Sequence, residues 1–164
     1  MNPAVRVVSG GPVIAVEDPR AADVLELLAE HLRDMHATSP AESVHALDPD
    51  ALAHPSITFW AARDGATGEL LGVGALKQHP GGLGELKSMR TAAAARGRGV
   101  ASAMLGVVVT EARRRGIREL KLETGAEDYF APARALYAKH GFLPCAPFAD
   151  YTDDPNSVFF ALEL

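Results

Sequence analysis

Apolar residues recur every three to four positions in two long stretches of the chain, and this period predicts amphipathic helices. The first stretch is Asp18–Met35, and we expect its apolar stripe to face a sheet. The residues of that stripe are Leu25, Leu28, Leu32 and Met35. The second stretch is Val100–Arg115, and Gly116 is its expected C-terminal cap. A shorter helix is predicted at Ala133–His140.

Shorter stretches, rich in β-branched and aromatic residues or alternating between apolar and polar ones, predict strands. Ile57–Ala62 and Leu70–Lys77 flank a polar turn with two glycines and so predict a hairpin. A third strand is expected at Glu85–Arg90. Because side chains alternate along a strand, one face of it should carry Glu85, Lys87 and Met89. The remaining predicted strands are Arg118–Thr124, Phe142–Phe148 and Ser157–Leu164.

The segment Ala37–Pro55 mixes proline, charges and short apolar patches, which indicates a loop with one short helix. The order of the other elements is helix, hairpin, strand, helix, strand, helix and a closing strand pair. This order predicts a mixed α/β fold with a largely antiparallel central sheet and helices on both faces. A length of 164 residues corresponds to one domain, which we expect to span residues 1–164.

Between the third strand and the second long helix lies Arg96–Ala101, a stretch with two glycines and two arginines. Glycines let a backbone approach an anion closely, the N–H groups at a helix start point toward it, and arginines add charge. The stretch therefore favours a pyrophosphate site, although a glycine-rich turn with solvated arginines has the same composition. It is neither a dinucleotide fingerprint nor a Walker loop, because the third glycine and the Gly-Lys-Ser/Thr sequence are missing.

Two ordered motifs resemble the GNAT superfamily of acyl-CoA-dependent N-acetyltransferases, and in particular its bacterial small-molecule members. Arg96-x-x-Gly99-x-Ala101 is similar to the phosphate-binding motif Arg/Gln-x-x-Gly-x-Gly/Ala of that family. Ala133-x-x-Leu136-Tyr137-x-x-x-Gly141-Phe142 is similar to the helix and turn that carry its tyrosine general acid. The resemblance covers most of the chain and is strongest from Gly84 to Phe142.

Two positions depart from the family pattern. Ala93 stands where members often have proline, which loosens a loop. Phe130 stands where many members have asparagine or glutamine, which removes one polar contact to the donor arm or the substrate.

The resemblance implies direct transfer of an acetyl group from acetyl-CoA to a primary amine through a tetrahedral intermediate. The loop would hold the pyrophosphate, and the backbone at the end of the third strand would hold the pantetheine arm. The donor-binding residues are then Met89, Arg90, Thr91, Arg96, Gly97, Arg98, Gly99, Val100, Ala101 and Ser102. Tyr137 would protonate the leaving thiolate, since a phenol with a pKa of about 10 stays protonated at neutral pH. Two alternatives stay open: a non-catalytic acyl-CoA-binding sensor or scaffold, and an acetyltransferase of protein lysines or N-termini.

A general base has to remove the proton of the amine. Glu85, on the strand that leads to the donor site, is the first candidate, and the alternative is a surface charge linked to Lys87. Glu123, at the end of the next strand, is the rival base. For the acceptor, an acidic late loop and the early loop could attract a cationic amine. The acceptor-binding candidates are Glu42, His45, Glu123, Phe130, Asp150 and Tyr151.

A formal net charge of -5 argues against nucleic-acid binding, because neutralising phosphates needs a basic face. The expected partner is a small-molecule amine, and a homodimer stays open. Apolar runs are far shorter than a membrane span and no secretory signal is visible, so we expect no membrane insertion and a cytoplasmic location. The single cysteine, Cys145, fits a reducing compartment. The six histidines are scattered, so no metal is expected.

Overall fold

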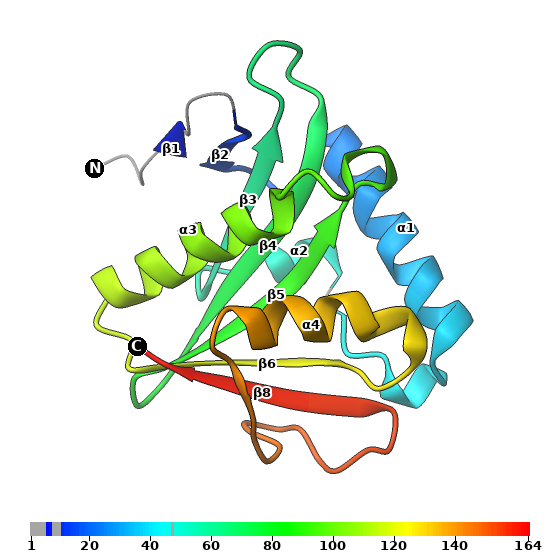
Figure 1. Cartoon of the computed structure of the whole chain (residues 1–164), viewed down its shortest axis with the longest axis vertical. Helices are drawn as coiled ribbons and strands as arrows, with labels where there is room; N and C mark the ends of the chain where they lie inside the picture. The colour runs from blue at the N-terminus through cyan, green and yellow to red at the C-terminus, as the bar shows by residue number, and fades with distance from the viewer. Residues whose placement is uncertain (1–5, 8–10, 47) are drawn as a thin grey trace.

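The computed structural model describes residues 6–7, 11–46 and 48–164, and in this part of the chain eight strands form one sheet (Figure 1). The strands are β1 (Arg6–Val7), β2 (Val13–Val16), β3 (Ile57–Arg63), β4 (Leu70–His79), β5 (Leu83–Thr91), β6 (Glu119–Gly125), β7 (Leu143–Pro144) and β8 (Ser157–Glu163). Their order across the sheet is β1-β2-β3-β4-β5-β6-β8-β7. Neighbours run antiparallel except for β5 and β6, which are parallel. The expected mixed, largely antiparallel sheet is therefore confirmed.

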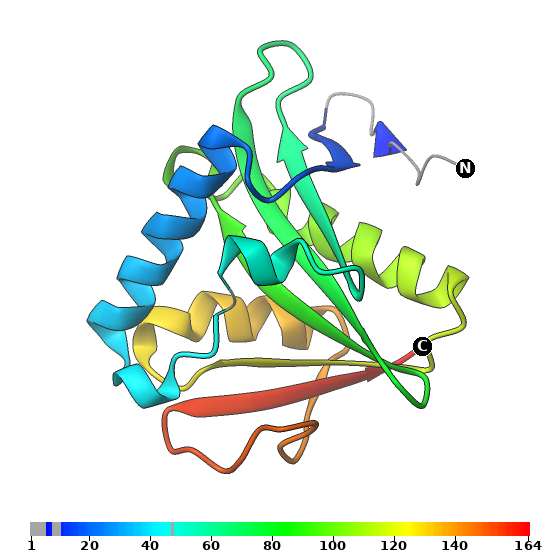
Figure 2. The same ribbon diagram turned by 180° about the vertical axis from the view of Figure 1, so that it is seen from behind.

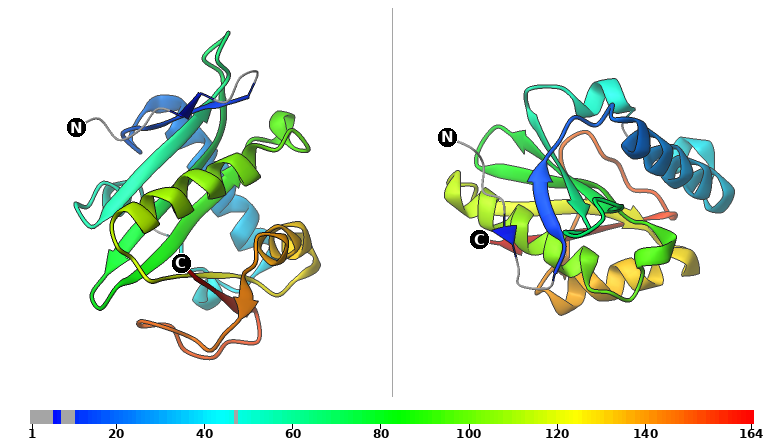
Figure 3. Two further views of the ribbon diagram at one scale, coloured as in Figure 1. Left: turned by 60° about the vertical axis from the view of Figure 1, so that its left-hand side comes forward. Right: turned by 90° about the horizontal axis from the view of Figure 1, so that it is seen from above.

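Helices cover both faces of this sheet, as the order of the elements predicts. The α-helices are α1 (Ala22–Thr38), α2 (Pro49–Leu52), α3 (Val100–Arg114) and α4 (Ala131–Lys139). Short 3-10 helices are η1 (Ala41–Ser43), η2 (Ala93–Ala95) and η3 (Asp128–Phe130). Figure 2 shows the face with α1 and α2, and the view from above in Figure 3 shows α3 and α4 on the opposite side of the sheet.

Alternation along β4 supplies one core on each face of the sheet. Leu76 packs in a cluster with Met104 and Leu105 of α3. Val73 packs in the other cluster, which includes Leu28 of α1. Because both faces of β4 are covered, its residues from Leu71 to Leu76 are all buried.

The parallel pair of β5 and β6 opens the sheet. Backbone pairing between them is limited to Leu83–Glu85 with Glu119–Lys121. Beyond these residues β5 remains paired with β4 as far as Thr91, while β6 remains paired with β8 as far as Gly125. The two strands therefore diverge toward their C-terminal ends and leave a gap in the middle of the sheet.

The predicted apolar stripe of the first helix is wrong for two of its four residues, Leu25 and Leu32. α1 begins at Ala22 rather than Asp18, and its buried residues are Val24, Leu27 and Leu28. Leu25 is 37% exposed and Leu32 is 40% exposed. Leucines lie on two adjacent sides of this helix, so its sequence is compatible with either side facing the sheet. Single exposed leucines are common on protein surfaces. The observed stripe continues from Leu28 to His31 and Met35, which places a histidine on the sheet-facing side.

The prediction that Met89 shares a face with Glu85 and Lys87 is also wrong. Ser88 has a φ of 54°, and the register between β4 and β5 shifts there, with Val73 opposite Arg90 but Ala75 opposite Lys87. A bulge of this kind adds one residue and reverses the alternation beyond it. The Met89 sulfur consequently packs over Gly74 beside Met104 of α3.

The other expected elements are present with shifted bounds. The last predicted strand pair is short, since β7 covers Leu143–Pro144 only and prolines lack the N–H that a longer ladder needs. The long early loop contains its one expected α-helix, α2, whose N-cap Asp48 accepts the Ala51 N–H at 2.8 Å. β2 was not predicted, because an isolated apolar run of four residues indicates neither a helix nor a strand. Gly116, with a φ of 75°, follows α3 as the expected cap.

None of the helices that the structure describes combines the length and the apolar character that crossing a bilayer requires.

Candidate active site

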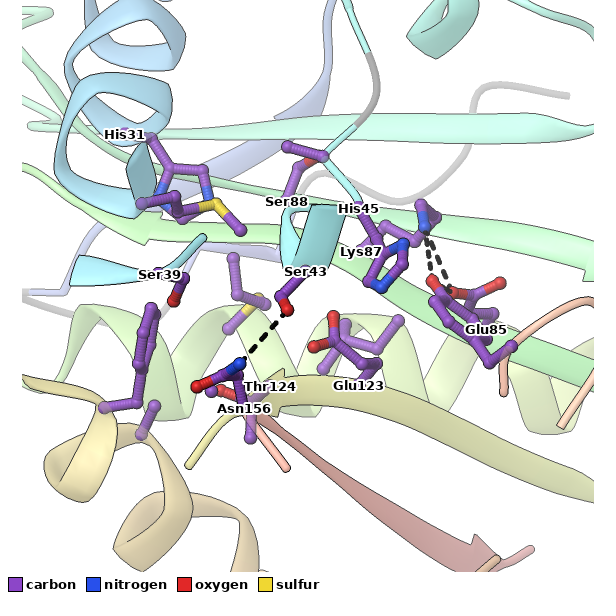
Figure 4. A pocket seen from close by; sticks show the side chains of 18 of the residues that line it. His31, Ser39, Ser43, His45, Glu85, Lys87, Ser88, Glu123, Thr124 and Asn156 are labelled. Carbon is purple, nitrogen blue, oxygen red and sulfur yellow. Dashed lines mark hydrogen bonds and ion pairs between the residues drawn. The ribbon is translucent and has the colours of Figure 1, made fainter. Parts of the chain in front are cut away.

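A cavity of about 110 Å³ lies where β5 and β6 diverge (Figure 4). Its walls come from β5, β6, α1 and α4 and from the loops before α2 and before β8. Among the residues that line it are Glu85, Glu123, Tyr137 and Tyr151. The structure therefore brings both candidate bases and the candidate acid into one cavity.

Glu85 is held in a dense network of hydrogen bonds. Its side chain is 3% exposed, and Oε1 lies 2.8 Å from His79 Nε2. Oε2 accepts from the Tyr151 hydroxyl at 2.6 Å and from Lys87 Nζ at 3.1 Å. Burial alone would raise the pKa of Glu85, but Lys87, Tyr151 and His79 together lower it below the usual value. Glu85 is thus an ionised carboxylate whose oxygens are already occupied.

Glu123 has a raised pKa, in contrast to Glu85. Burial raises its pKa to about 7, and the negative charges of Glu85 and Asp154 add to this, although Ser157 and Lys87 act against it. A carboxylate with a pKa near the working pH can accept a proton and lose it again, which is the property of a general base. Burial is thus the main cause of the raised pKa of Glu123.

Tyr137 lies on α4 with its ring packed against Phe142 and Phe160. It is 6% exposed, and burial raises the pKa of its hydroxyl, with the charge of Glu123 adding to the effect. The phenol consequently keeps its proton at all ordinary pH values. A residue in this state can donate a proton but cannot act as a base.

The glycine loop has the shape of an anion site. Gly97 and Gly99 both have a φ of 77°, and nothing lies within 4 Å of where a Cβ would stand on either residue. Gly99 is the N-cap of α3 and makes no side-chain capping bond, so the N–H groups of the first turn have no side-chain acceptor there. Arg98 is half exposed, with its guanidinium 3.7 Å from Asp64. An approaching diphosphate would find open space, N–H donors and positive charge, so the residues fit a CoA pyrophosphate.

Arg90, which the sequence analysis placed in the donor site, directs its side chain elsewhere. Its guanidinium donates to Glu30 at 2.8 Å, to Asp34 at 2.5 Å and to the Tyr129 hydroxyl at 2.8 Å. These contacts tie α1 and η3 to the end of β5. Any contribution of Arg90 to donor binding would have to come from its backbone, as the prediction for Met89–Thr91 states.

The other expected donor residues lie at the start of α3. Val100 is buried in the core, whereas Ala101 and Ser102 are partly exposed. The Ser102 hydroxyl lies 3.2 Å from His140 Nε2, which links the first turn of α3 to the end of α4.

Four of the six acceptor candidates line the cavity: His45, Glu123, Phe130 and Tyr151. The ring of His45 packs edge-on against that of Tyr151 at 5.1 Å, so the early and late loops meet at this point. Glu42 and Asp150 are exposed and do not line the cavity.

Several lining residues were not found from the sequence, namely His31, Met35, Ser39, Ser43 and Asn156. The signal for His31 was its place in the stripe of Leu28 and Met35, where a polar residue interrupts a sheet-facing helix side. Ser43 and Asn156 gave no such signal. They meet only in the folded chain, where Asn156 Nδ2 donates to Ser43 Oγ at 3.3 Å.

Comparison with known proteins connects this arrangement to one family. The sequence model of the acetyltransferase (GNAT) family matches residues 22–142. This range includes α1, the glycine loop and Tyr137.

Named relatives cover almost the whole chain. The uncharacterized N-acetyltransferase YsnE of Bacillus subtilis (strain 168) is 48% identical over 151 residues, which is 92% of this chain and 99% of the relative. The IAA acetyltransferase of Azospirillum brasilense is 41% identical over 152 residues, which is 92% of this chain and 97% of that protein. Among solved structures, a Klebsiella pneumoniae protein assigned to the acyl-CoA N-acyltransferases is 29% identical with a TM-score of 0.76. That similarity covers 93% of this chain and 97% of the Klebsiella chain.

Proposed function

Because the chain belongs to the acetyltransferase (GNAT) family and is an N-acetyltransferase, we propose that it moves an acetyl group from acetyl-CoA to the primary amine of a small molecule. The family uses acetyl-CoA, and the open glycine loop before α3 supports the same donor here. The sensor or scaffold alternative has no comparable support, since the relatives carry the names of N-acetyltransferases.

One observation carries the mechanistic part of the proposal: Glu123, with a pKa near the working pH, and Tyr137, a protonated phenol, line the same cavity. A pair of groups of which one readily gives up its proton and the other keeps it can divide base and acid roles between them.

The reaction then needs two proton transfers. The lone pair of the neutral amine attacks the thioester carbonyl carbon to form the C–N bond and a tetrahedral oxyanion, and Glu123 accepts the proton that the nitrogen then loses. Collapse of the oxyanion breaks the C–S bond, and Tyr137 donates its proton to the departing thiolate. The products are the N-acetylated amine and CoA with a free thiol. Tyr137 regains a proton from water, and Glu123 releases its own.

We assign Glu85 a positioning role in place of the base role that the sequence favours. Its two oxygens already accept from Tyr151 and Lys87 and lie beside His79. Taking up a further proton would break part of this network, whereas Glu123 needs no such rearrangement. The ionised Glu85 instead helps to keep the pKa of Glu123 high.

For the donor, we propose that the backbone of Gly97–Ser102 binds the pyrophosphate, with Arg96 and Arg98 adding charge. The pantetheine arm would follow the backbone of Met89–Thr91, where β5 has no partner on the side of β6. The thioester would then enter the gap between the two strands. The active unit in this proposal is one domain that spans residues 1–164.

A relative's name supports a small-molecule acceptor: the Azospirillum brasilense protein is an IAA acetyltransferase. The cavity, of about 110 Å³, has room for a small reacting group. The side chains at the mouth, His45 and Tyr151, offer hydrogen bonds and aromatic contact to such a molecule.

The proposal is tested by incubating the purified protein with acetyl-CoA and a panel of small primary amines. Thiol release is followed, and the products are identified by mass spectrometry. We expect amine-dependent thiol release and an N-acetylated product. A lysine-containing peptide in the same assay tests the protein-acetyltransferase alternative. Transfer to the peptide alone would overturn the small-molecule acceptor.

A further inference from the structure

His31 occupies a position on α1 where the fold calls for an apolar residue. It follows Leu28 by three positions on the buried side of the helix and lines the cavity together with Met35, one turn further on. Figure 4 shows its ring at the wall that α1 contributes, with Glu85 on the other side of the view and Glu123 between them.

The imidazole of His31 has no hydrogen-bond partner among the residues that the structure describes. Its Nδ1 is fully buried and has no hydrogen-bond partner there. Two serine side chains of the cavity have partners within the protein. Ser39 Oγ donates to Glu127 at 3.0 Å, and Ser43 Oγ donates to Asp154 at 2.6 Å. The imidazole of His31 has no such partner there.

An unsatisfied buried polar group lowers the stability of the fold, and leucine at this position would avoid that loss. A fold that keeps such a group beside a cavity has a use for it when a ligand supplies the missing bond.

The charge state of His31 follows from its surroundings. Burial lowers its pKa to about 4, and the nearby guanidinium of Arg90 adds to this, while Asp34 acts in the opposite direction. The ring is therefore neutral at physiological pH, with one N–H donor and one acceptor nitrogen. A neutral imidazole suits an uncharged partner.

On the basis of the proposed function, we propose that His31 binds the acceptor by a hydrogen bond and so selects amines that carry a second, uncharged hydrogen-bonding group. Hydroxyl, carbonyl and amide groups belong to this class. The amine would lie at Glu123, and the second group would lie toward α1. His31 is in this role a specificity-determining residue, separate from the proton transfers.

The test compares amines that differ only in this group, such as ethanolamine with propylamine and tyramine with its methyl analogue. For the acceptor that fits best, we expect the hydroxyl member to have a kcat/KM about ten- to a hundredfold higher. In His31→Leu the ratio should fall to about threefold or less, with the KM for acetyl-CoA unchanged. His36→Leu is the matched control, since His36 lies on the same helix and is exposed. It should keep the full ratio.

Thermal unfolding distinguishes this role from a structural one. If the imidazole serves a ligand, His31→Leu should be as stable as the parent or more so, because an unpaired polar group has been removed. His31→Gln, which keeps a polar end, should fold and retain part of the preference. A ratio that survives in His31→Leu, or a parent with no preference between the paired amines, would overturn the proposal. A parent that acetylates no amine at all would instead refute the proposed function.

Discussion

In the proposed mechanism the hydroxyl group of Tyr137 donates its proton to the leaving thiolate. Phenylalanine in its place keeps the ring that packs against Phe142 and Phe160 and removes only the proton donor. We expect Tyr137→Phe to lower kcat about 10²- to 10⁴-fold and to leave the Kd for acetyl-CoA unchanged. Tyr129→Phe is the control, because the Tyr129 hydroxyl bonds Asp34 outside the cavity. Equal rates for the parent and Tyr137→Phe would remove the tyrosine from the mechanism.

The raised pKa of Glu123 lowers the stability of the folded protein at high pH. Its pKa is about 7 in the folded chain and about 4.3 in an unfolded one, so the native state binds more protons between these values. Stability therefore falls as the pH rises through this window. We expect Glu123→Gln to raise the free energy of unfolding by about 2–3 kcal/mol at about pH 8 and hardly at all at about pH 4.

Urea titrations at the two pH values measure this difference. Glu119→Gln is the control on the same strand, because Glu119 is more exposed and pairs with Lys121. A gain of stability that is the same at both pH values would mean that the pKa of Glu123 is not raised.

The sequence could identify Tyr137 as the candidate acid, but it could not predict the raised pKa of Glu123. The tyrosine sits in a local motif that ends at Gly141 and Phe142, so its neighbours in sequence are enough to find it. The pKa of Glu123 depends on Glu85, Lys87 and Asp154, which come from other elements. The residues next to Glu123 in the sequence do not reveal these charges.

Among the elements, the start of α3 carries the donor site of the proposal. Gly99→Glu would put bulk and negative charge where the phosphates are expected, so we expect the Kd for acetyl-CoA to rise by about a hundredfold or more. Gly81→Glu is a matched control. Gly81 has a φ of 79° and open space around it, as Gly99 does, but it lies in the turn between β4 and β5.

Both variants place a side chain in the left-handed region and should lose similar stability, of about 1 kcal/mol. Calorimetric titration with acetyl-CoA should then separate them. If Gly99→Glu bound the donor as tightly as Gly81→Glu does, the site would have to lie elsewhere.

The sequence could predict which elements form, but not how each one is rotated or interrupted. The spacing of apolar residues predicted α1 but not which side of it is buried. Leu25 and Leu32 form one apolar stripe, and Val24 and Leu28 form another. Packing against the sheet selects between the two. β5 was found by its composition, yet the bulge at Ser88 comes from pairing with β4. Both errors concern features that depend on the neighbouring element: the sheet for the rotation of α1, and β4 for the bulge in β5.

Considered as a whole molecule, the chain is expected to unfold as one unit. The two apolar clusters share the sheet, so neither can melt while the other stays folded. We expect a single calorimetric transition for residues 1–164. Acetyl-CoA at about a hundred times its Kd should move it upward by roughly 5–10 °C, since ligand binding at that excess adds about 2.7 kcal/mol. Two separate transitions would contradict the single domain.

The fold class was the most predictable level, and the acceptor pocket was the least. Turn signals and periodicity order the elements along the chain, and the pairing rules for short connections then leave few arrangements. The pocket draws on β5, β6, α1 and α4 and on two loops, so residues such as Ser43 and Asn156 become neighbours only after folding. Predictions therefore succeeded where contacts are local and failed where they are not.

The pH dependence of kcat/KM for the best amine tests most directly whether Glu123 is the base in this cavity. Both a neutral amine, with a pKa of about 10, and an ionised Glu123 are required. We therefore expect log kcat/KM to rise with a slope of about two below a pH of about 7 and with a slope of about one above it. Glu123→Gln should rise with a slope of about one throughout and at a lower rate. A parent profile without the change of slope, or a variant that keeps it, would contradict the account.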